Sequence, residues 1–209
     1  KFNLEPRVSE LDSWKEFVDR VSDVDREISV AITGKYTYLK DAYASIIESL
    51  CHAGGSVGCK VNLRWVETTN LSEGEVFELL KGVDGIIVPG GFGSRGVEGK
   101  ISCVKFAREN NVPFLGLCYG LQLAVIEYAR NVCGLKNASS IEFDSDTSEA
   151  VIDIMHEQKA IQGKGGTMRL GSYPAILRRG SRVFDLYGNE RISERHRHRY
   201  EVNPDYHKI

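Results

Sequence analysis

The feature that most constrains the fold is a short apolar run at residues 112–116, which leads into a Gly-Leu-Cys-Tyr-Gly sequence at 116–120 and then into helical periodicity. An apolar run between a proline and a glycine predicts a buried strand. Gly-x-Cys-x-Gly after such a strand is typical of a nucleophile elbow, the strained turn that presents a reactive side chain between strand and helix. Bulky side chains at Gly116 and Gly120 would clash in this turn. The pattern therefore places Cys118 at the N-terminus of a helix.

That position would give Cys118 a chemical role. The dipole and the unpaired N–H groups of a helix N-terminus lower the pKa of a thiol and can hold a developing oxyanion. The alternative is a buried structural cysteine, the commoner fate of a free cysteine. The pentapeptide alone does not decide between the two.

Strand and helix patterns alternate through the first two thirds of the chain. This alternation predicts right-handed βαβ crossovers and a mostly parallel sheet with helices on both faces. Ligands bind such sheets at the carboxyl ends of the strands, where two Gly-rich turns, 90–93 and 116–120, are expected. The expected strands lie at 28–32, 61–66, 85–89 and 112–116, and the expected helices at 11–22, after an Asp41 cap, after a Ser72 cap, at 99–110 and at 121–132.

The pattern weakens after residue 134. Residues 144–166 are polar and then Gly-rich, which predicts a mobile loop. Residues 171–177 and 197–202 are candidates for antiparallel strands, with 183–187 between them.

Composition narrows the class of protein. A net charge of -2 gives no reason to expect nucleic acid or an acidic membrane as partner. The sequence contains no apolar run of about eighteen residues, so no transmembrane helix is expected. The five cysteines are odd in number and contain no Cys-x-x-Cys pair, which argues against a disulfide framework or zinc site and for a reducing, cytoplasmic location. They are Cys51, Cys59, Cys103, Cys118 and Cys133.

The turn at Gly90-Gly91 suggests a partner for the cysteine. A glycine pair after a buried strand leaves backbone N–H groups uncovered, which suits an oxyanion, although an ordinary tight turn has the same sequence. A Cys118 thiolate could attack a carbonyl whose oxygen meets the N–H groups of Gly91 and Tyr119. Residues 93–96 are too short for a phosphate-binding P-loop.

Five motifs together resemble the glutaminase domain of CTP synthase. The motifs at 89–93 and 116–122 are shared by class I glutamine amidotransferases in general, whereas those at 165–171 and 194–201 are more specific to CTP synthase. The resemblance covers the chain from about residue 3 and implies a flavodoxin-like α/β core, a mostly parallel sheet with helices on both faces and a nucleophile elbow. The motifs lie at 89–93, 116–122, 140–143, 165–171 and 194–201.

The resemblance also implies the roles of individual residues. Cys118 would be the nucleophile, and the N–H groups of Gly91 and Tyr119 would form the oxyanion hole. Glu142 would pair with the α-ammonium of glutamine and Arg199 with its α-carboxylate, as a zwitterion requires. Tyr119 replaces the leucine usual in the family, but only its backbone has a role. The implied substrate-binding residues are Gly91, Phe92, Tyr119, Gln122, Glu142, Arg199 and Tyr200, with no metal ligand.

The implied activity is hydrolysis of L-glutamine through a cysteine thioester. The ammonia would pass to an N-terminal amidoligase domain that aminates UTP to CTP in pyrimidine biosynthesis. We expect residues 1–25 to be a linker and helix leading from that domain, and 26–209 to be the glutaminase domain. No cofactor is expected in this domain, whereas the full enzyme, expected to be a homotetramer, would use ATP and Mg with GTP as effector.

One part of the family pattern is missing. Class I amidotransferases complete a catalytic triad with a His-Pro-Glu motif near the C-terminus, and this sequence ends at 206–209 without one. His196 and His198 are the nearest histidines by motif, but neither is the base in the resembling family. We therefore expect a C-terminally truncated domain whose parent chain supplies the histidine and glutamate.

Other interpretations stay open on the sequence alone. In an extended strand Arg195, Arg197 and Arg199 would share one face, which could bind RNA or phosphate, form an ion-pair network, or recognise the substrate or a partner domain. The chain could also be a cysteine hydrolase or chaperone-like member of the same elbow fold, or a regulatory module without a complete triad.

Overall fold

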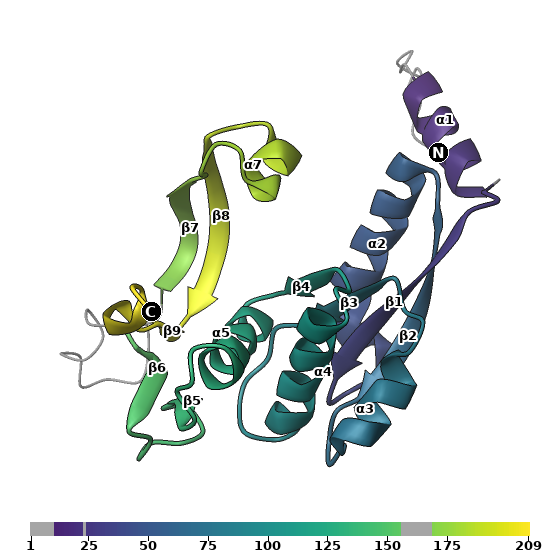
Figure 1. Cartoon of the computed structure of the whole chain (residues 1–209). Helices are drawn as coiled ribbons and strands as arrows, with labels where there is room; N and C mark the ends of the chain where they lie inside the picture. The colour runs from purple at the N-terminus through teal and green to yellow at the C-terminus, as the bar shows by residue number, and fades with distance from the viewer. Residues whose placement is uncertain (1–10, 23, 156–168) are drawn as a thin grey trace, which may run out of the picture. The chain divides into compact units, whose positions relative to one another are not determined.

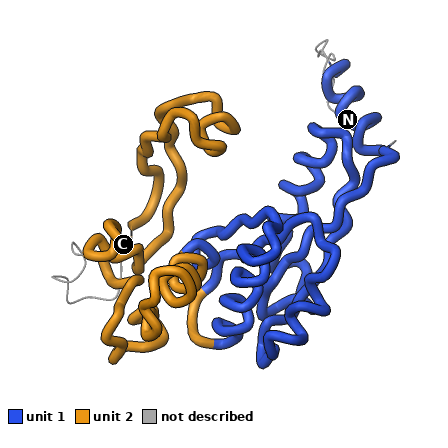
Figure 2. The backbone as a smooth tube through the Cα atoms, in the orientation of Figure 1, with its two compact units in different colours: residues 1–91, 95–121 blue, residues 92–94, 122–209 orange. Residues whose placement is uncertain are grey.

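The computed structural model describes residues 11–22, 24–155 and 169–209. The chain divides into two compact units (Figure 2). Unit 1 comprises Lys1–Gly91 and Arg95–Leu121, and unit 2 comprises Phe92–Ser94 and Gln122–Ile209. The predicted boundary between a linker and the glutaminase domain at residue 25 stays a prediction.

Unit 1 is built on a four-stranded parallel sheet in the order β2-β1-β3-β4 (Figure 1). This order and the parallel pairing confirm the flavodoxin-like core. The centre of the sheet is apolar, with Ala31, Ile32 and Val88 fully buried. The strands are β1 (Glu27–Gly34), β2 (Lys60–Glu67), β3 (Gly85–Val88) and β4 (Phe114–Gly116).

The helices of unit 1 begin largely where the sequence predicts. Ser72 and Glu75 form a capping box that starts α3, as expected. Asp41 is not the N-cap of α2, because a 3-10 turn precedes that helix and its cap is Tyr43, whose ring packs 5.4 Å from that of Trp65. The helices are α1 (Asp12–Ser22), α2 (Ala44–Val57), α3 (Glu73–Leu80) and α4 (Val97–Glu109), with the 3-10 turn η1 at Lys40–Tyr43.

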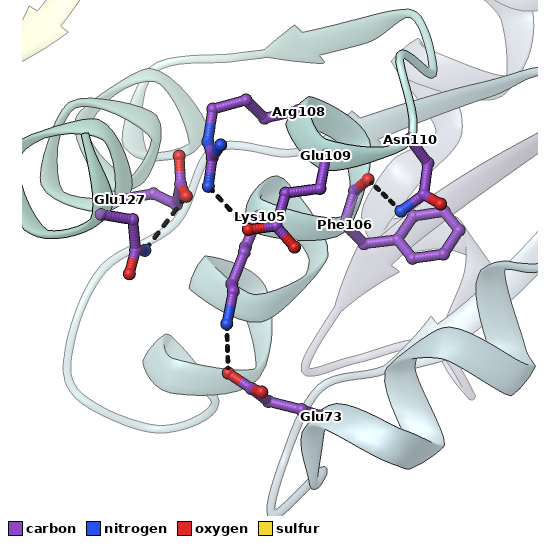
Figure 3. A network of polar contacts seen from close by, with 8 residues as sticks. Glu73, Lys105, Phe106, Arg108, Glu109, Asn110 and Glu127 are labelled. Atoms are coloured by element: carbon purple, nitrogen blue, oxygen red, sulfur yellow. Dashed lines mark hydrogen bonds and ion pairs between the residues drawn. The ribbon is translucent and has the colours of Figure 1, made fainter.

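Helix α4 packs against α3 and the sheet through an apolar face and carries polar contacts on its outer side. Lys105 reaches Glu73 at 2.9 Å, and the Asn110 amide donates to the Phe106 carbonyl at 2.9 Å (Figure 3). The Phe77 and Phe106 rings meet edge to face at 5.7 Å between α3 and α4. Lys105 is therefore a surface cation.

Unit 2 contains most of α5 (Tyr119–Asn131) and a small sheet in the order β5-β6-β9. Its central strand β6 pairs parallel with β5 and antiparallel with β9. The prediction of a loop at 144–166 is wrong for residues 149–154, which form β6. Residues 156–168 lie outside the described residues. These strands are β5 (Ala138–Ser140), β6 (Glu149–Ile154) and β9 (Tyr200–Val202).

The remainder of unit 2 is an antiparallel hairpin of β7 (Arg169–Ile176) and β8 (Arg191–His198). Helix α7 (Arg182–Tyr187) lies between its strands in the sequence, and the 3-10 turn η2 (Pro204–Tyr206) follows β9. The antiparallel pairing is confirmed, but the second strand begins well before residue 197. No helix of the described residues is long and apolar enough to cross a bilayer.

Candidate active site

The predicted nucleophile elbow is present in unit 1. Strand β4 ends at Gly116, helix α5 begins at Tyr119, and Cys118 between them has a φ of 53°. A left-handed conformation costs a residue other than glycine roughly 1–2 kcal/mol, so the fold must hold this turn in place. The Leu117 N–H donates to the Val88 carbonyl of β3 at 2.9 Å, which ties the elbow to the sheet.

Cys118 is exposed, whereas Cys59 and Cys103 are buried. The alternative of a buried structural cysteine at position 118 is therefore wrong. A thiol that is both exposed and held at a helix N-terminus is available for attack on a substrate.

The two elbow glycines are required by close backbone approach. A Cβ on Gly116 would lie 2.7 Å from the backbone nitrogen of Leu121. A Cβ on Gly120 would run into the carbonyl oxygen of Val88. The predicted steric reason for the Gly-x-Cys-x-Gly pattern is confirmed.

The Gly90-Gly91 turn after β3 lies beside the elbow, as the strand order predicts. A Cβ on Gly90 would be 3.5 Å from the Cβ of Cys118, and one on Gly91 would be 3.6 Å from the Tyr119 ring. Side chains at these two positions would therefore be in van der Waals contact with the cysteine and its neighbour. Gly91, Cys118 and Tyr119, the residues of the expected nucleophile and oxyanion hole, come together within one unit.

A buried cation close to the Gly90-Gly91 turn was not predicted from the sequence. Lys100 on α4 is only 3% exposed, and its Nζ lies 5.4 Å from the Tyr119 ring centroid. Burial, followed by the charge of Lys35, lowers the pKa of Lys100 to about 8. The helical spacing could have predicted its burial, because Lys100 lies on the same apolar face of α4 as Cys103, Val104 and Ala107.

The expected ammonium ligand, Glu142, follows β5 in unit 2. Its Oε1 accepts a hydrogen bond from the Gly93 N–H at 2.8 Å. Phe92, the neighbour of Gly93, belongs to the same unit, and its side chain is exposed. The structure thus brings Glu142 to the segment that continues from the glycine turn in the sequence.

Gln122 and Tyr200 are also brought together in unit 2. The Gln122 amide donates to the Tyr200 carbonyl at 2.9 Å, which anchors the start of β9 on α5. The expected contact of Gln122 with glutamine stays a prediction. Arg199 is half-buried and lies in a bend between β8 and β9, so the expectation that it continues the strand face of Arg195 and Arg197 is wrong.

One cluster of described residues has the composition of a metal site. The ligand atoms of His196, His198 and Glu201 all lie within 4.8 Å of one another, and the two histidine Nδ1 atoms are 3.3 Å apart. The Glu201 carboxylate, however, is paired with the Arg169 guanidinium at 2.7 Å. A divalent cation would have to displace that guanidinium and would be repelled by its charge. We therefore assign no metal to this cluster, and the interpretation of the Arg195, Arg197 and Arg199 face as an ion-pair network stays a prediction.

Comparison with known proteins identifies the class. The family described as glutamine amidotransferase class-I matches residues 38–208. The chain therefore belongs to the class I glutamine amidotransferase family.

Within this family the chain is similar to the glutaminase domain of CTP synthases, which confirms the resemblance that the motifs predict. The CTP synthase of Methanocaldococcus jannaschii is 56% identical over 215 residues, which cover 100% of this chain and 40% of the relative. That of Bacillus subtilis is 51% identical, covering 95% of this chain and 37% of the relative. A solved structure of the Trypanosoma brucei CTPS glutaminase domain with bound acivicin is 36% identical, with a TM-score of 0.79, covering 87% of this chain and 70% of that one.

The chain corresponds to only part of each of these relatives. It spans about 40% of the length of the curated relatives that it matches.

Proposed function

We propose that this chain hydrolyses glutamine to glutamate and ammonia and is the glutaminase part of a CTP synthase. The observation that carries the proposal is the exposed Cys118, held at a left-handed φ between β4 and α5 beside the Gly90-Gly91 turn. The similarity to CTP synthases over the full chain supports the choice of substrate.

In the proposed cycle the Cys118 thiolate attacks the side-chain amide carbon of glutamine. The carbonyl oxygen becomes an oxyanion, to which the N–H groups of Gly91 and Tyr119 donate. The C–N bond then breaks, the nitrogen takes a proton from a general acid and leaves as ammonia, and a γ-glutamyl thioester remains. Water cleaves the thioester, which releases glutamate and regenerates the thiol.

Five further residues are proposed to hold the amino-acid end of the substrate. Glu142 would accept hydrogen bonds from the α-ammonium, and Arg199 would donate two to the α-carboxylate. Phe92, Gln122 and Tyr200 complete the proposed substrate-binding set. The Gly93 N–H that already bonds to Glu142 supports this role, because it holds the carboxylate in one orientation.

The role of the whole protein is a further part of the proposal. The ammonia would aminate UTP to CTP on an N-terminal amidoligase domain that uses ATP and Mg, with GTP as effector and a homotetramer as the assembled state. Residues 1–25 would be the linker to that domain. This domain itself would need no cofactor, and the location would be cytoplasmic, as the cysteine pattern predicts.

An electrophilic glutamine analogue tests the assignment. We expect it to add covalently to Cys118 in the complete protein and to abolish ammonia release. Cys51 is also exposed and is the matched control within the same protein. Peptide mass spectrometry showing the adduct on Cys51, or on no cysteine, would contradict the proposal. Turnover of peptides in preference to free glutamine would instead support a cysteine hydrolase of the same fold.

A further inference from the structure

Lys100 is a buried cation that the proposed cycle does not use, and it lies against both residues of the proposed oxyanion hole. Its Nζ would be 3.8 Å from a Cβ on Gly91, and it lies 5.4 Å from the centroid of the Tyr119 ring. All three residues belong to unit 1, so these contacts lie within one compact unit.

The surroundings of Lys100 favour positive potential at this place. Lys35 is 9% exposed, and Arg95 donates to the Lys35 carbonyl at 2.8 Å. The Glu67 carboxylate raises the pKa of Lys100, and its Oε1 and Oε2 already accept hydrogen bonds from Thr69 at 2.6 Å and Thr37 at 3.2 Å.

The charge balance around the ammonium is therefore positive. The Lys35 and Arg95 charges lower the pKa of Lys100, the Glu67 charge raises it, and burial has the largest effect. Burial also raises the pKa of the Cys103 thiol to about 12, so this thiol is neutral at pH 7. Burying an amine among other cations destabilises the fold, so packing alone does not account for a lysine at this position. An apolar side chain of similar length would fill the space without that penalty.

We propose that Lys100 is a positioning residue of the glutaminase site, whose buried ammonium stabilises negative charge on Cys118 and on the oxyanion. This inference rests on the proposed function. The ammonium acts through the electric field that it creates next to Gly91 and Tyr119, and it does not touch the substrate.

The physical basis is that a charge in a desolvated place acts on its neighbours more strongly than one in water. A cation below the elbow favours the thiolate over the thiol and favours the tetrahedral intermediate over the planar amide. Lys100 remains mostly charged at pH 7, because its pKa of about 8 is higher. Its effect should fade as the pH rises through 8.

The test compares Lys100→Met with Lys105→Met in the complete protein. Both variants remove one lysine charge from α4, but Lys105 is the surface cation paired with Glu73 (Figure 3). The first readout is the rate at which iodoacetamide alkylates Cys118 between pH 6 and 10, followed on the Cys118 peptide by mass spectrometry. The second is the split between kcat and KM for glutamine.

For Lys100→Met we expect alkylation of Cys118 at pH 7 to slow roughly 3- to 10-fold, with kcat reduced by a similar factor and KM within about twofold. The ratio of wild-type to variant rates should shrink above pH 8, and Lys105→Met should behave as wild type. We also expect the melting temperature of Lys100→Met to equal or exceed that of wild type.

Two outcomes would overturn the inference. One is wild-type alkylation and kcat in Lys100→Met, which would show that its charge does not reach the site. The other is a lower melting temperature or failure to fold, which would make Lys100 a packing residue. If Cys118 of the wild type is itself unreactive, the proposed function fails, and that result is distinct from either.

Discussion

Replacing Gly120 by alanine tests whether the elbow is held as tightly as its geometry indicates. The new methyl group would run into the carbonyl oxygen of Val88, which also accepts the 2.9 Å hydrogen bond from the Leu117 N–H. Strand β3 and the elbow would have to separate. Overpacking of this kind costs about 1–3 kcal/mol, and weakening one buried hydrogen bond adds about 1 kcal/mol.

Together these effects predict that Gly120→Ala lowers the free energy of unfolding by about 2–4 kcal/mol, a drop in melting temperature of roughly 5–15 °C for a chain of this size. The assay is urea denaturation followed by circular dichroism, with the alkylation rate of Cys118 as a second measurement. That rate should change, because the elbow sets the φ of the cysteine.

Gly74→Ala is the matched control. A Cβ at Gly74 meets nothing within 4 Å, and the residue lies in the first turn of α3. Alanine there should stabilise the helix by about 0.5–1 kcal/mol. If Gly120→Ala and Gly74→Ala differed by less than about 0.5 kcal/mol, the proposed steric role of Gly120 would be refuted.

Two further predictions concern the substrate site and a helix start. Arg199→Ala should raise KM for glutamine about 10- to 100-fold because charged hydrogen bonds are lost, and it should leave Cys118 reactive. The control is Arg197→Ala, on the exposed face of the hairpin, which should leave KM unchanged. A wild-type KM in Arg199→Ala would exclude the carboxylate role. Ser72→Ala should destabilise the fold by about 1 kcal/mol because the capping box with Glu75 is lost. Ser49→Ala, which removes only a bond to its own helix, is the control, and equal urea midpoints would contradict the capping argument.

The parallel core and the elbow were predictable because their signals are local. Each strand of the first sheet is a short apolar or alternating run, and the elbow glycines stand within five residues of each other. The close approach that these glycines permit depends only on the adjacent strand β3. Local patterns of this kind predict structure well because they do not depend on contacts with distant parts of the chain.

Strand β6 was not predictable in the same way. Its apolar run at residues 150–152 is only three residues long, between Glu149 and Asp153, and it becomes a strand by pairing with β5 on one side and with β9, about fifty residues later, on the other. The same reason accounts for the error at Asp41, where packing of Tyr43 on Trp65 sets the helix start. Tertiary contacts override weak local preference in both places.

The β5-β6-β9 sheet has a consequence for substrate binding. Glu142 leaves the sheet two residues after β5, and Arg199 stands one residue before β9. The Ile141 N–H donates to the Ile152 carbonyl at 3.2 Å, and the Asn203 N–H donates to the Val151 carbonyl at 2.9 Å, so both edges are fastened to the same central strand. If Glu142 and Arg199 hold the two charges of the amino acid, the backbone segments that carry these two side chains are both fixed to strand β6. A substitution that disturbs β6 should then weaken glutamine binding, although β6 contributes neither charge.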